Sequence, residues 1–389
     1  MIYSKYMLKI GLKNKLNFIP LLLPMIIMLF LMMMNTQAMK NASFVANLNQ
    51  DIQIMHTAVG NQTDILATDS SLSKEDEQVI TESNSILANN IRLNEQAISF
   101  AEAGKWTEAL TIQLNLMEQN ELRHVEANIP ASEDFKKYLY MNYASYKELS
   151  RLNAEPQQDG LEMKGANYVY RMMDSIFPVV FMICLVALIS NMVNASIIEG
   201  IDIEKLFPES PIKFQLRKIM VLTLFGLFFY VLFLAGTFAL SSALNGVGTF
   251  QYPINIYDGV FDQTKPLINV VLKAGILQCL SLFFVISCVY FVSLLAKNGL
   301  ITLFVSTVVL LGAVLLTGQI APMAKYLHFL PTTYVNAIRV VNNQLAFENN
   351  NPSITFSNGV WVLLLASLLV IFMILAIKVQ SRRQEMLMN

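Results

Sequence analysis

The sequence predicts an all-α membrane protein with six transmembrane helices and a helical extracellular domain inserted between the first and second of them. Apolar residues make up 54% of the 389 residues, charged residues only 14%, and the mean hydropathy is +0.48. Soluble proteins rarely have such a composition. The apolar residues are also grouped: one span near the start, about 140 polar and acidic residues, then five spans in the last 215 residues.

Each predicted span has about the 20 residues that a bilayer requires. The fourth span exceeds the hydrocarbon thickness, which indicates tilt or interfacial residues at its ends. The six spans are Leu16–Met34, Ile176–Val193, Ile219–Ala243, Leu267–Leu295, Leu300–Thr317 and Val360–Ile377.

The positions of Lys and Arg beside the spans predict the orientation, because basic residues are retained on the cytoplasmic side. With six spans, three basic segments fall on one side, so both chain ends are expected in the cytoplasm. These segments carry Lys5, Lys9, Lys13 and Lys15; Lys205, Lys213, Arg217 and Lys218; and Lys378, Arg382 and Arg383.

The amino-terminal part, residues 1–34, is expected to form an amphipathic cytoplasmic helix followed by the first span. An alternative is a cleaved signal peptide, because Thr36-Gln37-Ala38 imitates a processing site. The apolar run of about 19 residues is longer than the usual signal core. An uncleaved anchor is therefore favoured.

Residues 35–174 are expected to face outward as a helical domain. They hold 20 acidic and 11 basic residues, a net charge of −9. Apolar residues recur near the 3.6-residue period from Lys74 to Ala103 and from Thr107 to Val125, with Gly104 between them. This pattern predicts an antiparallel helical hairpin, with a capping box at Ser73 and Asp76 and a third helix from Ser132.

No catalytic or metal-binding pattern stands out. Cys184, Cys279 and Cys288 lie in apolar spans, and His56, His124 and His328 are far apart without an HExxH grouping. There is also no Walker A sequence. We therefore expect no enzyme activity and no cofactor in this chain.

Polar residues inside predicted spans are energetically costly and are candidates for a translocation path. The main ones are Asn191, Asn194, Lys273 and Gln278. A structural interpretation stays open, because Lys273 is near enough to the surface to snorkel and Asn191 can hydrogen-bond between helices.

The segment between the second and third spans, residues 195–218, carries the most specific pattern. Acidic residues from Glu199 are expected to begin a short helix that Pro208 and Pro211 end, and basic residues begin the next helix. A short amphipathic element at this depth is typical of docking to a cytoplasmic partner. The docking candidates are Glu199, Asp202, Glu204, Leu206, Phe207 and Pro211.

This segment resembles the coupling segment of ABC-2 type permeases, the membrane subunits of type V ABC exporters. Glu199 matches the acidic position, Leu206 and Pro211 match the leucine and proline, and Lys218 matches the lysine that opens the third span. The family usually has Gly-Thr where this chain has Gly200-Ile201-Asp202.

The layout is similar over nearly the whole chain, with one span, an outer domain and a five-span block in residues 175–389. Within that block, residues 318–358 resemble the outer re-entrant loop of the family, and Leu330 to Arg339 resemble its bend before the last span. Broken backbone at that depth must be buried in protein or face water, and Pro322 and Pro331 are suited to such breaks.

The resemblance implies one half of a transporter in the bacterial plasma membrane. Two permeases pair as a homodimer or a heterodimer among membrane lipids, separate ATPase subunits bind ATP and Mg²⁺, and nucleic acid is not expected as a partner. The acidic outer domain favours a cationic, bacteriocin-like peptide or another amphipathic substrate, for export or immunity. Lipid, drug or sodium efflux by the same machinery is an alternative, and so is a membrane-anchored sensor or assembly factor.

Overall fold

The computed structural model describes residues 15–69, 71–123, 132–194, 197–198, 201–202, 210–315 and 321–388. The predicted amphipathic helix of residues 1–15 therefore lies outside the described residues, apart from Lys15, which begins η1. The chain divides into two compact units. One comprises Met1–Leu31, Lys164–Val247 and Ile268–Asn389, and the other Met32–Met163 and Gly248–Leu267. We call them the span unit and the helical unit.

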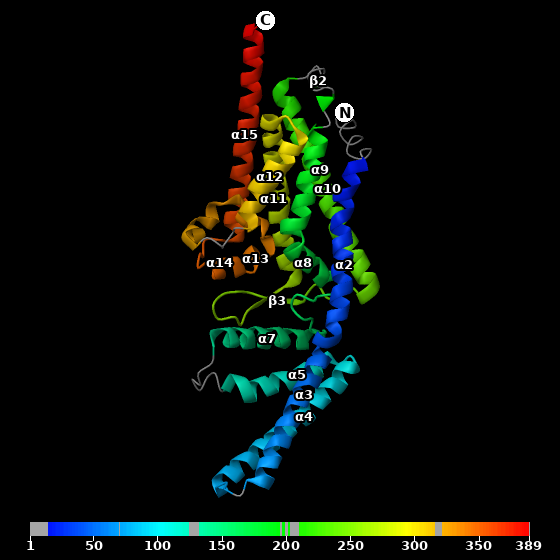
Figure 1. The fold of residues 1–389 in the computed structure, drawn as a ribbon, viewed down its shortest axis with the longest axis vertical. Coiled ribbons are helices and arrows are strands. Elements are labelled where there is room, and N and C mark those ends of the chain that lie inside the picture. Colours follow the sequence, from blue (N-terminus) through cyan, green and yellow to red (C-terminus); the bar gives the residue numbers. More distant parts are fainter. Residues whose placement is uncertain are drawn as a thin grey trace. The chain divides into compact units, whose positions relative to one another are not determined.

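The described chain is mainly helical, and five of its helices are long and apolar enough to cross a membrane (Figure 1). Their bounds are Phe18–Thr68, Phe177–Asn194, Ile212–Asn245, Leu267–Ala296 and Phe356–Gln380. The first of these comprises α2 (Phe18–Ala42) and α3 (Phe44–Thr68). The predicted span Leu300–Thr317 corresponds to a shorter apolar helix, α12 (Gly299–Leu315), of 17 residues. An all-α membrane protein is thus the class that the structure supports.

The predicted second span is interrupted near its start. α8 (Gly165–Ser175) leads into a π-helical turn, η3 (Phe177–Phe181), and then α9 (Met182–Asn194). Pro178 lies in η3 and has no backbone N–H to donate, which accounts for the wider turn. Phe177 and Phe181 stack at 5.5 Å, and Phe181 stacks on Phe229 of the next helix at 4.7 Å.

The remaining long helices of the span unit are α10 (Pro211–Asn245), α11 (Leu267–Ala296) and α15 (Phe356–Met388). α10 packs on α8 and α15, and α12 packs on α9. α10 begins well before the predicted Ile219 because Pro211 suits the first helical turn, where its missing N–H needs no partner.

The region predicted to be re-entrant contains four short helices among its described residues. They are η5 (Ala321–Phe329), η6 (Pro331–Val335), α13 (Ala337–Val341) and α14 (Gln344–Glu348). Pro331 occupies the first turn of η6, so one of the two expected proline breaks begins a new helix.

In the helical unit, α3 packs on α4 (Lys74–Glu102), α4 on α5 (Trp106–Met117), and α5 on α7 (Glu133–Leu152). The predicted hairpin around Gly104 is confirmed, and Gly104 adopts φ +72°, a conformation that favours glycine. The predicted starts at Ser73 and Ser132 are also confirmed, because each serine hydroxyl accepts a hydrogen bond from the third residue after it.

The core of the helical unit is small and apolar. Its buried cluster consists of Phe44, Leu48, Ala97, Ala101, Ala109, Leu110 and Leu149. Trp106 packs edge-on against Phe44 with ring centroids 5.7 Å apart. Two elements of this unit were not predicted from the sequence: α3, and a hairpin of β3 (Pro253–Asn255) with β4 (Thr264–Pro266).

The β3–β4 hairpin is part of the helical unit although it lies between the third and fourth predicted spans. Ser145 Oγ donates to Asn255 Oδ1 at 2.9 Å, and the Gln157 amide donates to the Tyr252 hydroxyl at 2.8 Å. The helical unit is therefore built from two separate chain segments.

Candidate functional site

The segment between α9 and α10 holds the predicted docking residues. Glu199, Glu204, Leu206 and Phe207 lie outside the described residues. Asp202 lies in β2 (Ile201–Asp202), which pairs antiparallel with β1 (Ile197–Ile198), Ile197 opposite Asp202.

The prediction of a helix from the acidic residues onward is wrong at Ile201 and Asp202. Isoleucines flank a two-residue connection that contains a glycine, and β-branched residues around such a connection favour a hairpin. Pro211, the last predicted docking residue, begins α10 after the N-cap Ser210 rather than ending the loop helix.

The first turns of α10 carry a buried polar cluster. Lys218 is 2% exposed, Gln215 is 3% exposed, and Tyr290 of α11 is fully buried. The Tyr290 hydroxyl donates to Gln215 Oε1, and Lys218 Nζ lies 4.9 Å from the Tyr290 ring centroid. A cation over an aromatic face is stabilised most where water is excluded. These contacts connect the start of α10 to the far end of α11.

A second polar contact lies where α9 ends. Asn191 Nδ2 donates to Oδ1 of Asn17 at 3.3 Å, and Asn17, which closes η1 (Lys15–Asn17) before α2, is 1% exposed. Asn194 Nδ2 donates to the Ser190 carbonyl at 2.8 Å, and its Oδ1 is buried without a hydrogen-bond partner in the described part of the chain. The bond between Asn191 and Asn17 joins the last turn of α9 to the start of α2.

We refer to these side chains together as the loop-end cluster: Asn17, Asn191, Gln215, Lys218 and Tyr290. Asn191 was predicted as a path residue and Lys218 as a basic residue beside the third span, whereas Asn17, Gln215 and Tyr290 were not predicted. One signal was present, because Gln215, Lys218 and the buried Leu222 recur at helical spacing on one face of α10.

The other predicted path residues are elsewhere. Gln278 of α11 is fully buried; its Nε2 donates to the Met173 carbonyl at 2.8 Å, and its Oε1 accepts from the Tyr230 hydroxyl. Met173 and Asn191 are 18 positions apart along α8, η3 and α9, roughly 27 Å of helix. Gln278 is therefore not a neighbour of Asn191 and Asn194, and the proposed common path of these residues stays a prediction.

Lys273 lies on an exposed face of α11, with Nζ 5.8 Å from the centroid of the Phe356 ring. Its neighbour Leu272 is 59% exposed. Within one copy of the chain, Lys273 thus lies on the exposed surface of the span unit and not in an enclosed path.

Tyr334 organises the short helices before α15. Its hydroxyl donates to the His328 carbonyl at 2.8 Å and accepts from Asn358 Nδ2 at 2.9 Å. Tyr334 is fully buried, and Arg339 of α13 pairs with Glu348 of α14. These side-chain contacts hold the short helices η5, η6, α13 and α14 to one another and to the start of α15.

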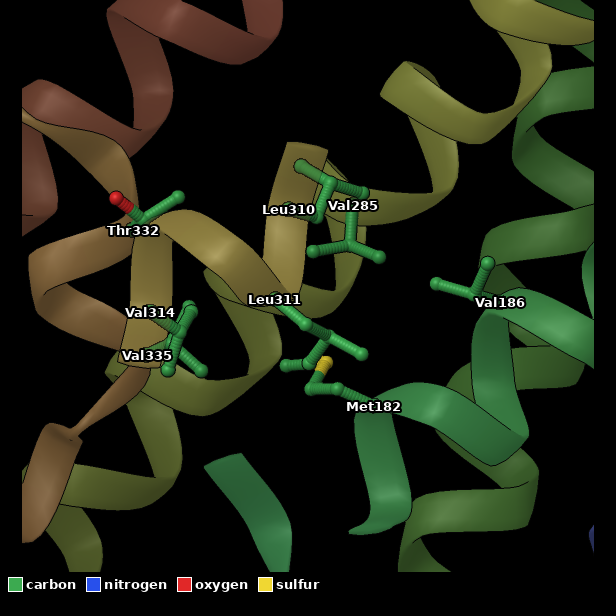
Figure 2. A pocket seen from close by; sticks show the side chains of 8 residues that line it. All are labelled: Met182, Val186, Val285, Leu310, Leu311, Val314, Thr332 and Val335. Carbon is green, nitrogen blue, oxygen red and sulfur yellow. The ribbon is translucent and has the colours of Figure 1, made fainter. Parts of the chain in front are cut away.

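A small apolar cavity of about 10 Å³ lies between α9, α11, α12 and η6. Figure 2 shows the side chains around it: Met182, Val186, Val285, Leu310, Leu311, Val314, Thr332 and Val335. This is about the space of one water molecule, and a water needs two or more polar partners, whereas the exposed lining is apolar. The cavity is a packing gap rather than a substrate site.

Among the described residues, no group of three or more His, Cys, Asp or Glu is placed to bind a metal ion. Comparisons with models of protein families, with curated proteins and with solved structures found no match to this chain.

Proposed function

We propose that this chain is the permease subunit of an ATP-driven exporter of the ABC-2 type. In this proposal it has six spans with both ends in the cytoplasm and an outer helical domain, and it moves a peptide or another amphipathic substrate. Two permeases form the path, and separate ATPase subunits dock on the segment between α9 and α10.

The observation that carries the proposal is the loop-end cluster. ATP-driven movement must reach the spans through a rigid connection, because an effector shifts an equilibrium only through contacts that differ between states. Lys218 and Gln215 lie in the first turns of the helix that follows the loop, and both contact Tyr290. A displacement of the loop is therefore passed to α10 and α11 together.

The Asn17–Asn191 bond makes a second connection, between the last turn of α9 and the start of α2. Buried polar side chains at a span end are costly unless they are paired, so their concentration beside a single loop favours a mechanical role there. Conduction then depends on relative movement of α2, α9, α10 and α11 in a pair of permeases.

The test uses the full chain with its ATPase partner in lipid vesicles. Charge reversal by Glu199→Lys with Glu204→Lys is expected to abolish substrate-stimulated ATP hydrolysis while membrane insertion stays normal. Glu95→Lys with Glu102→Lys, two exposed positions of α4, is the matched control and keeps the stimulation. Unchanged coupling in the loop variant would remove the proposal.

A further inference from the structure

The distal halves of α3 and α4 form a two-helix arm, residues 53–69 and 71–90 (Figure 1). None of these residues is buried. The proximal halves, in contrast, provide Phe44, Leu48, Ala97 and Ala101 to the core of the helical unit. The arm therefore holds its shape by one helix–helix seam and offers two open faces.

Half-buried side chains and one polar contact define the seam. Gln62 Nε2 donates to Ser83 Oγ at 3.4 Å between the two helices. The half-buried apolar residues at helical spacing along the seam are Met55, Val59, Leu66, Ile80 and Leu87.

Four large apolar residues lie together on one open face, which we call the arm face. Ile54 is 60% exposed, Ile65 43%, Val79 65% and Ile86 50%. Ile54, Ile65, Val79 and Ile86 each precede a seam residue by one position, a rotation of about 100°. Because α3 and α4 are antiparallel, these rotations bring all four residues to the same side.

The opposite face of the arm has no large aliphatic side chain among its described residues. It carries exposed His56, Gly60, Thr63, Ala67, Thr81, Ser85 and Ala88. Scattered exposed isoleucines need no explanation, but an asymmetry between two faces of one hairpin indicates a surface that is covered by a partner.

The arm is also strongly acidic. Residues 53–90 contain six carboxylates and one basic residue, Lys74. Glu82 is three positions after Val79 and four before Ile86, so it lies beside both, and Glu75 is four positions before Val79. The carboxylates are Asp64, Asp69, Glu75, Asp76, Glu77 and Glu82.

These features select one class of partner. A second copy of the arm would bring the same carboxylates against themselves, which is unfavourable. A basic amphipathic helix supplies an apolar stripe for the isoleucines and cations for the flanking carboxylates, the usual way in which a helix docks on a helical surface.

We infer that the arm face binds a cationic amphipathic peptide helix. The role of this binding rests on the proposed function: in a peptide exporter, Ile54, Ile65, Val79 and Ile86 would capture the substrate. The binding itself requires no ATPase.

The test uses the full chain in nanodiscs of neutral phosphatidylcholine, without ATPase. The probe is a fluorescent 14-residue amphipathic Leu/Lys peptide that carries one photoreactive group, and empty nanodiscs give the lipid background. Anisotropy is expected to show binding that weakens with salt, and cross-links are expected within residues 53–90. A Leu/Glu peptide of the same pattern is expected not to bind.

Ile65→Ser with Val79→Ser is expected to weaken binding at least about tenfold, since it removes two apolar contacts. Ala67→Ser with Thr81→Ser, on the opposite face, is the matched control and leaves binding unchanged. Equal binding by both variants, or cross-links outside the arm, overturns the inference. Cross-links between two copies of the chain that Ile65→Ser with Val79→Ser abolishes would assign the face to self-association instead.

The inference and the proposed function fail separately. Intact ATPase coupling without peptide binding to the arm contradicts only the inference. Peptide binding to the arm, together with a coupling assay in which no ATPase docks on the chain, contradicts only the proposed function.

Discussion

Lys218 Nζ lies 4.9 Å from the ring centroid of Tyr290, and both side chains are almost completely buried. The contact joins the second turn of α10 to the last turns of α11. A buried ammonium is energetically costly, and the aromatic face offsets part of that cost. The contact with Tyr290 therefore fixes the position of the Lys218 ammonium near the start of α10.

Tyr290→Leu removes the aromatic face from Lys218 and the hydroxyl from Gln215, whereas Tyr290→Phe keeps the ring. We expect the leucine variant to lose about 2 kcal/mol of stability and the phenylalanine variant about 1 kcal/mol. Thermal unfolding of the purified chain in detergent measures both. Equal unfolding midpoints for the two variants would show that the ring face contributes nothing.

Substitutions at Gln278 and Tyr230 test whether the hydrogen bond between these two side chains stabilises the span unit. Gln278→Leu leaves the Tyr230 hydroxyl and the Met173 carbonyl without this partner, so we expect destabilisation of about 1–3 kcal/mol. Tyr230→Phe in the same chain is expected to restore part of the loss, with a coupling near 1 kcal/mol. If the two losses are simply additive, the bond has no structural role.

Gly359 is required by the fully buried Tyr334. A Cβ at Gly359 would lie 2.4 Å from Cδ1 of the Tyr334 ring, whereas a Cβ at Gly275 meets no atom within 4 Å. Gly359→Ala is therefore expected to cost about 1–3 kcal/mol, while Gly275→Ala is neutral or stabilising. Unfolding midpoints of the two alanine variants check this, and equal midpoints would contradict it.

Asp51 and Glu121 make the stability of the helical unit depend on pH. Burial raises the pKa of Asp51, and burial followed by the charge of Asp51 raises the pKa of Glu121. The folded unit thus binds these protons more tightly than the unfolded chain. The contribution of Asp51 and Glu121 to the free energy of unfolding is therefore greatest below about pH 4, and it is lost as the pH rises through their raised pKa values.

Asp51→Asn with Glu121→Gln is expected to remove that loss and to stabilise the unit at pH 7. Trp106 fluorescence in a Trp361→Phe background reports unfolding of the helical unit alone, since the chain has two tryptophans. The lowered pKa of Asp69, which Ser71 hydrogen bonds cause, acts in the opposite direction but is present in both proteins. Parallel pH profiles for variant and parent would contradict the assignment.

Sequence patterns predicted the elements whose signals are local. Gly104 and the caps Ser73 and Ser132 were identified because turn and cap residues act within three or four positions. Helix α3 was missed because the apolar residues of its distal half are divided between two faces, with Met55, Val59 and Leu66 on the seam and Ile54 and Ile65 on the arm face, which blurs a single apolar stripe. The β3–β4 hairpin was missed because each strand has only three residues, too few for an alternating apolar pattern, and because Ser145, which bonds to Asn255, is 110 residues away in sequence.

The candidate site was only partly predictable for the same reason. The loop and its basic flank stood out, but Tyr290 lies 72 positions after Lys218, and no local pattern indicates that pairing. A polar residue in an apolar helix looks the same in the sequence whether it hydrogen-bonds to another helix or lines a translocation path. Gln278 was consequently grouped with Asn191 although the structure separates them.

Purification of the full chain from its own membranes tests the central claim most directly. The tagged chain is extracted in mild detergent, and nucleotide hydrolysis is measured in the purified sample. We predict that a separate ATPase co-purifies with the chain, and that Glu199→Lys with Glu204→Lys removes both the partner and the hydrolysis. A sample that contains the folded chain with neither partner nor hydrolysis would contradict the account.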